Sequence, residues 1–363
     1  SEMTTLFNLL SYKPSYTGLS SYVQRILAAW SPDDRPLQLR LQSSGRAEIS
    51  RSLVLPSEQR SLRMRWLQNN GLVQHGVSLR RLLKGQLPDK IYSPYTDWLW
   101  AFPEIPQVIT CHDLTPLYFP NSRRAYLRSY FWLPQHLRRA HIVIAISHTV
   151  ADQLIDIGLS ASHIEVVYNG VAPITNPATS PLTGDSVVVA RHARNKNVGL
   201  ALSGFASFLK LEPRWSGKLV IVGSSDSCTK ELLRQELELG LQGRVRWISH
   251  MVEKELESLL RSAFCLISPS LMEGFNYPLL EAQAIGIPTL ASRIPIHEEL
   301  YAHSTLFFEL GDQGRSMAAQ LQRLALDRCL WSDLSRAGLS NAASRTNHGQ
   351  AQALSELLNR TIT

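Results

Sequence analysis

Cysteine is scarce in this chain of 363 residues, and the four cysteines, Cys111, Cys228, Cys265 and Cys329, lie far apart. None belongs to a Cys-x-x-Cys pair, and none has a histidine at metal-ligand spacing. This scarcity excludes a disulfide scaffold and the common zinc-binding patterns. We therefore expect buried, reduced thiols, as in proteins of the cytosol.

Long apolar runs are also absent. The longest, such as residues 141–147, have the length of a strand, whereas a membrane-spanning helix needs roughly 18 apolar residues. The N-terminal residues lack the basic start and the small-residue cleavage site of a signal peptide, so we expect none and take Met3 as the natural start. With 18% charged and 44% hydrophobic residues, the composition is that of a globular protein with room for two domains.

Positive charge is concentrated in the first half of the chain. Residues 1–180 carry 18 Lys and Arg against 12 Asp and Glu, which accounts for most of the net charge of +7. Two basic segments are predicted to be helical, 57–68 and 121–141, and the second has four aromatic residues interleaved. A solvated face backed by core aromatics is the common interpretation. Contact with an anionic membrane surface or an anionic lipid-linked substrate is the alternative, and no nucleic acid is expected.

Short apolar strands alternate with helical segments along the whole chain, which predicts parallel sheets covered by helices on both faces. A segment rich in Pro, Thr and Ser, residues 172–185, interrupts this pattern, and we interpret it as a linker between two Rossmann-like domains facing across a cleft. Ser147 and Gly158 are expected to cap a helix between them. Strands are predicted at residues 4–10, 89–94, 106–111, 141–147 and 164–168, and then at 186–190, 218–223, 245–249, 264–268, 288–292 and 305–309.

The loop after the strand at 264–268 has the most informative polar pattern. Residues 270–288 read SLMEGFNYPLLEAQAIGIP, with Glu273 before a predicted helix and Glu281 inside it. Pro278 is expected at the first helical position, so Glu281 falls in the first turn. Taken alone, the two are a solvated loop carboxylate and a glutamate that complements the helix dipole. In combination, the N–H groups at the helix start would bind phosphate and the carboxylates would bind sugar hydroxyls.

This tract resembles the signature of the family 4 retaining glycosyltransferases, which have the two-domain GT-B fold. The family form is E-G-F-G-x-P-x-x-E-A-x-A-x-G-x-P, and this chain departs from it at Asn276, a residue type that tolerates positive φ. The resemblance implies that Glu273 contacts the transferred sugar of a nucleotide-sugar donor and that Glu281 contacts its ribose. The other donor-binding residues that it implies in this tract are Gly274, Phe275, Asn276, Tyr277 and Leu280.

Residues 187–197 resemble the family's Arg-x4-Lys segment, which implies that Arg191 and Lys196 bind the diphosphate. Fixed cations there stabilise the charge that develops on the leaving group. Ala190 stands where the family has glycine, and Arg194 is either solvated or a third phosphate contact. Alone, such a basic loop is surface charge.

Segments outside these two tracts also resemble the family. Residues 108–120 are similar to the family's strand ending in His-Asp, which implies that His112 lies near the reacting sugar, although an isolated histidine there is commonly structural. Gly18 resembles the first glycine of the N-terminal loop, and Ser20 replaces the second. In the second half, Gly223, His250 and Met251 fall in post-strand loops that border the donor.

The resemblance also implies different binding roles for the two domains. Residues 1–178 form an acceptor-side Rossmann-like domain and residues 179–345 a donor-binding one. Residues 346–363 form a C-terminal helix, and its packing back on the first domain is left open. We expect a cytoplasmic protein, with a peripheral position on the inner face of the membrane also left open.

No Asp-x-Asp pair occurs, so we expect no metal and no cofactor, with basic residues neutralising the diphosphate instead. The predicted reaction is retaining transfer of a hexose from a UDP- or GDP-sugar, with UDP-glucose preferred, to a glycan or lipid-linked oligosaccharide in polysaccharide biosynthesis. The alternatives are a nucleotide-sugar epimerase or a phosphorylase of the same fold, and a nucleotide-sugar-binding protein without catalysis.

Overall fold

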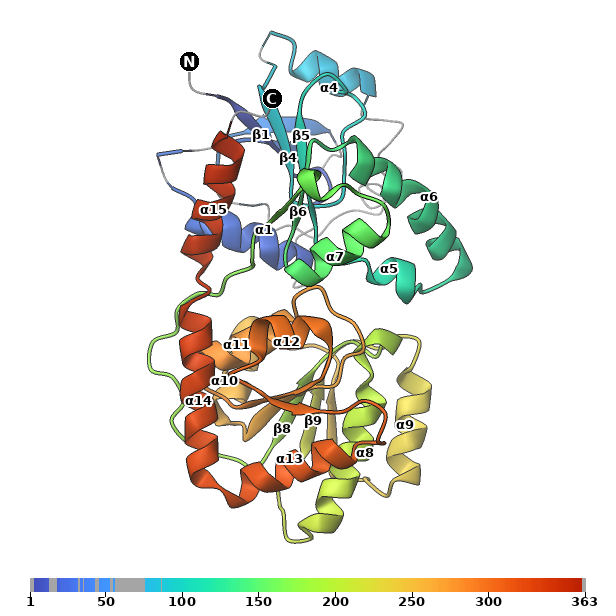
Figure 1. Cartoon of the computed structure of the whole chain (residues 1–363), viewed down its shortest axis with the longest axis vertical. Coiled ribbons are helices and arrows are strands. Elements are labelled where there is room, and N and C mark those ends of the chain that lie inside the picture. The colour runs from blue at the N-terminus through green and yellow to red at the C-terminus, as the bar shows by residue number, and fades with distance from the viewer. Residues whose placement is uncertain are drawn as a thin grey trace. The chain divides into compact units, whose positions relative to one another are not determined.

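The computed structural model describes residues 3–12, 18–31, 33–34, 36–42, 46–52, 55, 76–85 and 87–360. The chain divides into two compact units, each with its own sheet (Figure 1). Unit 1 comprises Ser1–Leu117, Ser122–Gly170 and Asn347–Thr363, and unit 2 comprises Tyr118–Asn121 and Val171–Thr346. The predicted basic helix at 57–68 lies outside the described residues.

Unit 1 has a seven-stranded sheet in the order β3-β2-β1-β4-β5-β6-β7, in which only the β2–β3 pair is antiparallel. All five strands predicted in this half are present. β2 and β3 were not predicted, and in β2 the apolar run is interrupted by Gln38 and Arg40. Both side chains are buried, and the Arg40 Nε donates to Gln38 Oε1 at 2.7 Å. The strands are β1 Thr5–Asn8, β2 Leu37–Leu41, β3 Ala47–Ser50, β4 Lys90–Ser93, β5 Gln107–Cys111, β6 Ile142–Ala145 and β7 Ile164–Val166.

Helices cover both faces of this sheet, with α15 and α6 on opposite sides (Figure 1). The expected caps of α7 are confirmed, because Ser147 Oγ accepts from Val150 N at 3.1 Å and Gly158 has a φ of +101°. The helices of unit 1 are α1 Gly18–Ala29, α4 Gly76–Leu82, α5 Thr115–Tyr118, α6 Arg123–Arg139, α7 His148–Asp156 and α15 Asn347–Asn359, with a 3-10 turn at Ala161–His163.

Unit 2 has a fully parallel six-stranded sheet in the order β10-β9-β8-β11-β12-β13, and its six strands were all predicted. The chain runs outward from β8 to β10 and then returns to β11 beside β8, so the switch point lies between β8 and β11. The strands are β8 Ser186–Val189, β9 Leu219–Val222, β10 Val245–Ile248, β11 Cys265–Ser268, β12 Thr289–Ser292 and β13 Leu306–Phe308.

The helices of unit 2 also lie on both sides of the sheet, with α14 on one side and α8 and α9 on the other (Figure 1). They are α8 Val198–Leu211, α9 Thr229–Glu238, α10 Glu253–Ser262, α11 Tyr277–Ile285, α12 Pro295–Tyr301, α13 Arg315–Leu326 and α14 Arg328–Ala343.

The short segment Tyr118–Asn121 aside, the chain passes into unit 2 at Gly170–Val171 and returns to unit 1 at Thr346–Asn347. The first crossing comes earlier than expected, because the presumed linker, residues 172–185, packs on unit 2 through its backbone. Ala178 N donates to Ile285 O at 2.8 Å, and Leu182 N donates to Ser262 O at 3.1 Å. The Pro-rich composition therefore reflects an extended surface segment and not a free linker.

The C-terminal helix α15 belongs to unit 1, where it packs against α1. Gln350 Oε1 accepts from Gly170 N at 2.8 Å, and the buried Lys90 donates through Nζ to the carbonyls of Leu358 and Arg360, the latter at 2.8 Å. A buried lysine thus caps the end of α15.

All four cysteines are free, but the expectation of buried thiols is correct only for Cys111 and Cys265. Cys329 is exposed because it is the second residue of the surface helix α14, and Cys228 is half-buried. Among the described residues, no helix combines the length and the apolar character needed to cross a membrane.

Candidate active site

The loops after β8 and β11 meet at the switch point of unit 2, where parallel sheets bind ligands. Two asparagines of the first loop fasten it to the second. Asn195 Nδ2 donates to Met272 O at 3.3 Å and its backbone carbonyl accepts from Leu271 N at 2.8 Å, while Asn197 Nδ2 donates to Pro269 O at 3.0 Å. The two loops therefore form one continuous edge.

Lys196 lies between these two asparagines in the first loop, and Glu273 follows the part of the second loop that they contact. The Lys196 Nζ is 2.7 Å from Glu273 Oε1 and 2.9 Å from Oε2, and Ser270 Oγ donates to Oε1 at 2.6 Å. The side chains are 23% and 11% exposed, so both are largely withdrawn from water. The sequence predicted each residue in the site but not their direct pairing. The arrangement presents a cation that can bind phosphate and a carboxylate that can accept sugar hydroxyls.

Asn276 holds the following turn in position. Its φ of 62° is in the left-handed region, as expected from the sequence. Its Nδ2 donates to Ser268 Oγ at 2.5 Å and to His297 Nε2 at 2.7 Å. His297 Nδ1 lies 2.7 Å from Ser292 O and donates to it, so the ring is neutral, with Nε2 as acceptor. Burial lowers the pKa of His297 from its ordinary value and keeps that state.

Sequence reasoning missed His297 and its neighbour Tyr301, both on α12. The Tyr301 hydroxyl lies 3.1 Å from the carbonyl oxygens of both Phe275 and Asn276 and donates to the turn. The available signal was the Pro295 helix start directly after a predicted strand, which places the next residues against the switch-point loops. These buried groups hold the turn at Phe275 and Asn276 in position.

Helix α11 begins at Tyr277, one residue before Pro278, and its first turn contains no acidic residue. Glu281 therefore lies in the second turn, and the prediction that it falls in the first turn is wrong. Leu280 is fully buried and packs in the core of unit 2. Gly274, Phe275 and Asn276 form the turn that leads into the helix, and Tyr277 is its first residue.

Arg191 follows β8 and forms an ion pair with Asp226, from Nη1 to Oδ2 at 3.0 Å, with 56% of its side chain exposed. Arg194 is exposed on the 3-10 turn at Arg194–Lys196. Gly223 is required by packing, because a Cβ there would lie 1.8 Å from Ala190 O. After β10, His250 is exposed and Met251 is half-buried.

Two predicted site residues belong to unit 1. His112 follows β5, its Nε2 donates to Pro94 O at 2.7 Å, and its ring contacts that of Tyr22 edge-on at 4.4 Å. Burial lowers the pKa of His112. Gly18 is the first residue of α1, the helix that carries Tyr22. Ser20 lies in the same first turn.

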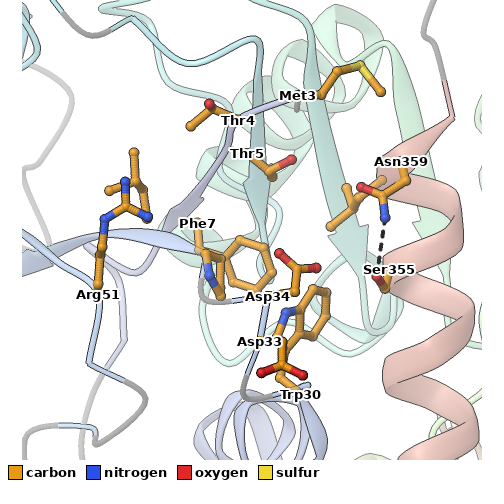
Figure 2. A pocket seen from close by; sticks show the side chains of 13 residues that line it. Met3, Thr4, Thr5, Phe7, Trp30, Asp33, Asp34, Arg51, Ser355 and Asn359 are labelled. Atoms are coloured by element: carbon orange, nitrogen blue, oxygen red, sulfur yellow. Dashed lines mark hydrogen bonds between the residues drawn. The ribbon is translucent and has the colours of Figure 1, made fainter. Parts of the chain in front are cut away.

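Unit 1 also contains a cavity of about 640 Å³ away from these residues (Figure 2). Its lining includes Thr5 and Leu37, which begin β1 and β2, and Phe7, whose ring meets that of Trp30 edge-on at 5.2 Å. Parallel sheets bind ligands at the carboxyl ends of their strands, and this cavity is at the amino ends. It is therefore separate from the predicted site. Within the described residues, no group of three or more His, Cys, Asp or Glu side chains could hold a metal ion.

Two family models match the chain. One is described as Glycosyltransferase Family 4 and matches residues 24–173, and the other is described as Glycosyl transferases group 1 and matches residues 184–327. The structure of Anabaena Alr3699/HepE in complex with UDP and glucose is similar, with a TM-score of 0.73 at 19% identity, covering 99% of this chain and 100% of that one. This likeness confirms the GT-B fold.

Curated relatives are similar over part of their length. O-antigen chain mannosyltransferase RfbU of Salmonella typhimurium is 28% identical over 212 residues, covering 57% of this chain and 58% of the relative. O-antigen chain mannosyltransferase B of Escherichia coli is 24% identical over 254 residues, covering 65% of each. The chain thus spans less than two thirds of the length of either relative. Together with the two family matches, these similarities show that the chain belongs to the group 1, family 4 glycosyltransferases.

Proposed function

We propose that this protein is a retaining glycosyltransferase that moves a hexose from a UDP- or GDP-sugar to a hydroxyl of a glycan or lipid-linked oligosaccharide in polysaccharide biosynthesis. The observation that carries the proposal is the Lys196–Glu273 pair at the switch point of unit 2. The names of the two O-antigen mannosyltransferases favour a polysaccharide product. They point to a mannosyl donor, whereas the HepE structure holds UDP and glucose, so both donor series are tested, UDP-glucose first.

The proposed chemistry needs cations near the diphosphate and acceptors near the sugar. Lys196, Arg191 and the N–H groups at the start of α11 stabilise the charge that develops on the leaving diphosphate, and Glu273 binds the sugar hydroxyls. The bond from the anomeric carbon to the diphosphate breaks, and the acceptor oxygen bonds to that carbon on the same face. The acceptor proton passes to the departing phosphate oxygen, so no protein base is required.

A binding role for Glu273 is favoured over a nucleophilic one. Both of its carboxylate oxygens already accept hydrogen bonds, from Lys196 and from Ser270. A carboxylate that is held and charge-stabilised in this way is a weaker nucleophile than a free one. The same contacts fix its orientation toward a ligand.

We further propose a role for each unit and a location for the protein. Unit 2 binds the donor, and His112 in unit 1 contacts the donor sugar near the reacting carbon. Unit 1 binds the acceptor, Gly18 approaches the diphosphate, and Gly223, His250 and Met251 border the donor base. No metal takes part, and the protein works in the cytoplasm at the inner face of the membrane.

Calorimetric titration with UDP, GDP, UDP-glucose and GDP-mannose, with EDTA present throughout, tests the donor site. Micromolar binding of one series in EDTA is expected, and it identifies the base. Incubation with the bound donor and a glycan acceptor should then give a product with the donor's anomeric configuration. Product formed without an acceptor would identify an epimerase instead, and donor binding with no turnover would identify a binding protein.

A further inference from the structure

Helix α6 of unit 1 has an unusually exposed N-terminal part. Of its 17 residues, only His136 and Leu137, near its C-terminal end, are buried. None of the first thirteen residues, Arg123–Gln135, is fully buried, although they include four large aromatic side chains. Figure 1 shows α6 at the outer edge of unit 1, on the opposite side of the sheet from α15.

Apolar side chains form a stripe along this exposed part. Tyr126, Leu127, Tyr130 and Phe131 follow the three- and four-residue spacing of one helix face, and they are 38%, 51%, 55% and 61% exposed. The rings of Tyr126 and Tyr130 stack at 5.8 Å, and those of Tyr130 and Phe131 meet edge-on at 5.4 Å. An apolar cluster of this kind on a surface marks an interaction site.

Three arginines lie beside the stripe on the helix surface. Arg123, Arg124 and Arg128 are exposed, and each lies three residues before a stripe residue, which places it one turn away on the same part of the helix surface. The helix contains no acidic residue, and among the described residues none forms an ion pair with these three arginines. The face therefore combines unneutralised positive charge with exposed aromatic rings.

We propose that this face of α6 docks on an anionic lipid bilayer, with the aromatic stripe in the headgroup region and the arginines on lipid phosphates. The bilayer is the occupant that offers a broad anionic plane directly above an apolar layer, which matches arginines beside a stripe of tyrosine, phenylalanine and leucine. This inference rests on the part of the proposed function that places the protein at the membrane, and it identifies the surface that would bind there.

Co-sedimentation with vesicles tests the docking without requiring turnover. The full chain should bind vesicles of phosphatidylglycerol and phosphatidylcholine, and bind pure phosphatidylcholine at least about tenfold more weakly. Changing Arg123, Arg124 and Arg128 together to Gln should weaken binding to the anionic vesicles about 100-fold, since each arginine near such a surface contributes about fivefold. The double variant Tyr130→Ser/Phe131→Ser should weaken it at least about tenfold.

Matched controls come from unit 2. Leu233 and Leu237 on α9 are exposed to a similar extent, 44% and 59%, and Leu233→Ser/Leu237→Ser should leave vesicle binding unchanged. The same is expected when the exposed Arg214, Arg246 and Arg328 are changed to Gln. Unchanged vesicle binding by the α6 variants, or equal binding to neutral vesicles, would overturn the proposal.

Two further readouts separate this inference from its alternatives. Sedimentation velocity reports self-association: a dimer that the Tyr130→Ser/Phe131→Ser variant dissolves, with no vesicle binding, would assign the stripe to a second copy instead. Donor titration by calorimetry should be unaffected in the α6 variants. A protein that binds donor but no vesicles refutes the docking alone, and one that binds vesicles but no donor refutes the donor site alone.

Discussion

The ammonium of Lys196 lies within 2.9 Å of both carboxylate oxygens of Glu273, although 77 residues separate them in the chain. The contact is possible because β8 and β11 are adjacent in the sheet, so the loops that follow them share one edge. The pair keeps both side chains in place without a donor. A diphosphate would take Lys196 as a partner, and the sugar hydroxyls would take Glu273.

Lys196→Ala should lower kcat/KM for the donor at least about 100-fold, because one transition-state contact to the leaving diphosphate is lost. Lys210→Ala, at an exposed position near the end of α8, is the matched control and should retain full activity. Steady-state kinetics on both variants, with melting curves to verify folding, makes the comparison. Near-normal turnover in folded Lys196→Ala would refute the phosphate role.

The ion pair between Arg191 and Asp226 leads to a second prediction. If Arg191 binds the diphosphate, then Asp226 competes with the donor for the same guanidinium. Asp226→Asn keeps the side-chain shape and removes the competing charge, so the donor Kd should fall by up to about fivefold, the usual strength of an exposed pair. Titration calorimetry measures it, with Asp333→Asn, which frees Arg336 on α14, as the control. Weaker donor binding in Asp226→Asn would mean that Asp226 orients Arg191 and does not compete with the donor.

Local sequence patterns predicted the strands of unit 2 because most of them, such as β9, are apolar runs buried in a parallel sheet. The edge strand β10 is less buried, and its Arg246 is exposed. The same criterion missed β2, where Gln38 and Arg40 are buried: Arg40 donates to Gln38 Oε1, whereas Gln38 Nε2 has no hydrogen-bond partner among the described residues. Their alternation with three leucines was the available strand signal.

The candidate residues Arg191, Lys196, Glu273 and Asn276 were named from the resemblance of their segments to the family signature, and their binding of a donor stays a prediction. The contacts among these residues were not predictable, because they depend on strand order, which no local pattern specifies. His297 and Tyr301 were missed for the same reason: they act on the turn from the helix after the next strand. The sequence thus named candidate residues, and only the fold supplied the contacts among them.

Asn276→Gly restores the residue that is usual at this position in the family signature, and we expect it to destabilise the protein. Glycine relieves the positive φ, a gain of up to about 1 kcal/mol. The substitution also removes the bonds to Ser268 and His297 and leaves the buried His297 Nε2 without this partner, a loss of about 2–3 kcal/mol. The free energy of unfolding should therefore fall by about 1–2 kcal/mol.

Asn176→Gly is the matched control for that substitution. Asn176 also has a positive φ, of 58°, but its side chain is exposed, so only the backbone gain applies and stability should be unchanged or slightly higher. Urea unfolding of the two variants separates the backbone gain from the loss of the buried hydrogen bonds. A stability increase in Asn276→Gly would show that the buried bonds contribute little.

The buried histidines make stability depend on pH in a defined direction. Burial lowers the pKa of His297 below its ordinary value of 6.5, with smaller opposing effects from the Ser292 carbonyl and Glu273 and a further lowering by Lys196. The unfolded chain therefore binds a proton at a higher pH than the folded protein does. The stability that the neutral ring contributes is complete above about pH 6.5, and it is lost as the pH falls from there through the folded-state pKa.

His297→Gln removes one titrating group and should reduce the slope of unfolding free energy against pH below 6.5 by up to about 1.4 kcal/mol per pH unit. His112, His136 and His192 are shifted in the same direction by burial, so part of the slope should remain. Urea unfolding at pH 7.5, 6.5 and 5.5 measures it, with His163→Gln on an exposed turn as the control. If His297→Gln keeps the full slope while His163→Gln reduces it, then the acid sensitivity arises at the surface and not in the network that holds the Asn276 turn.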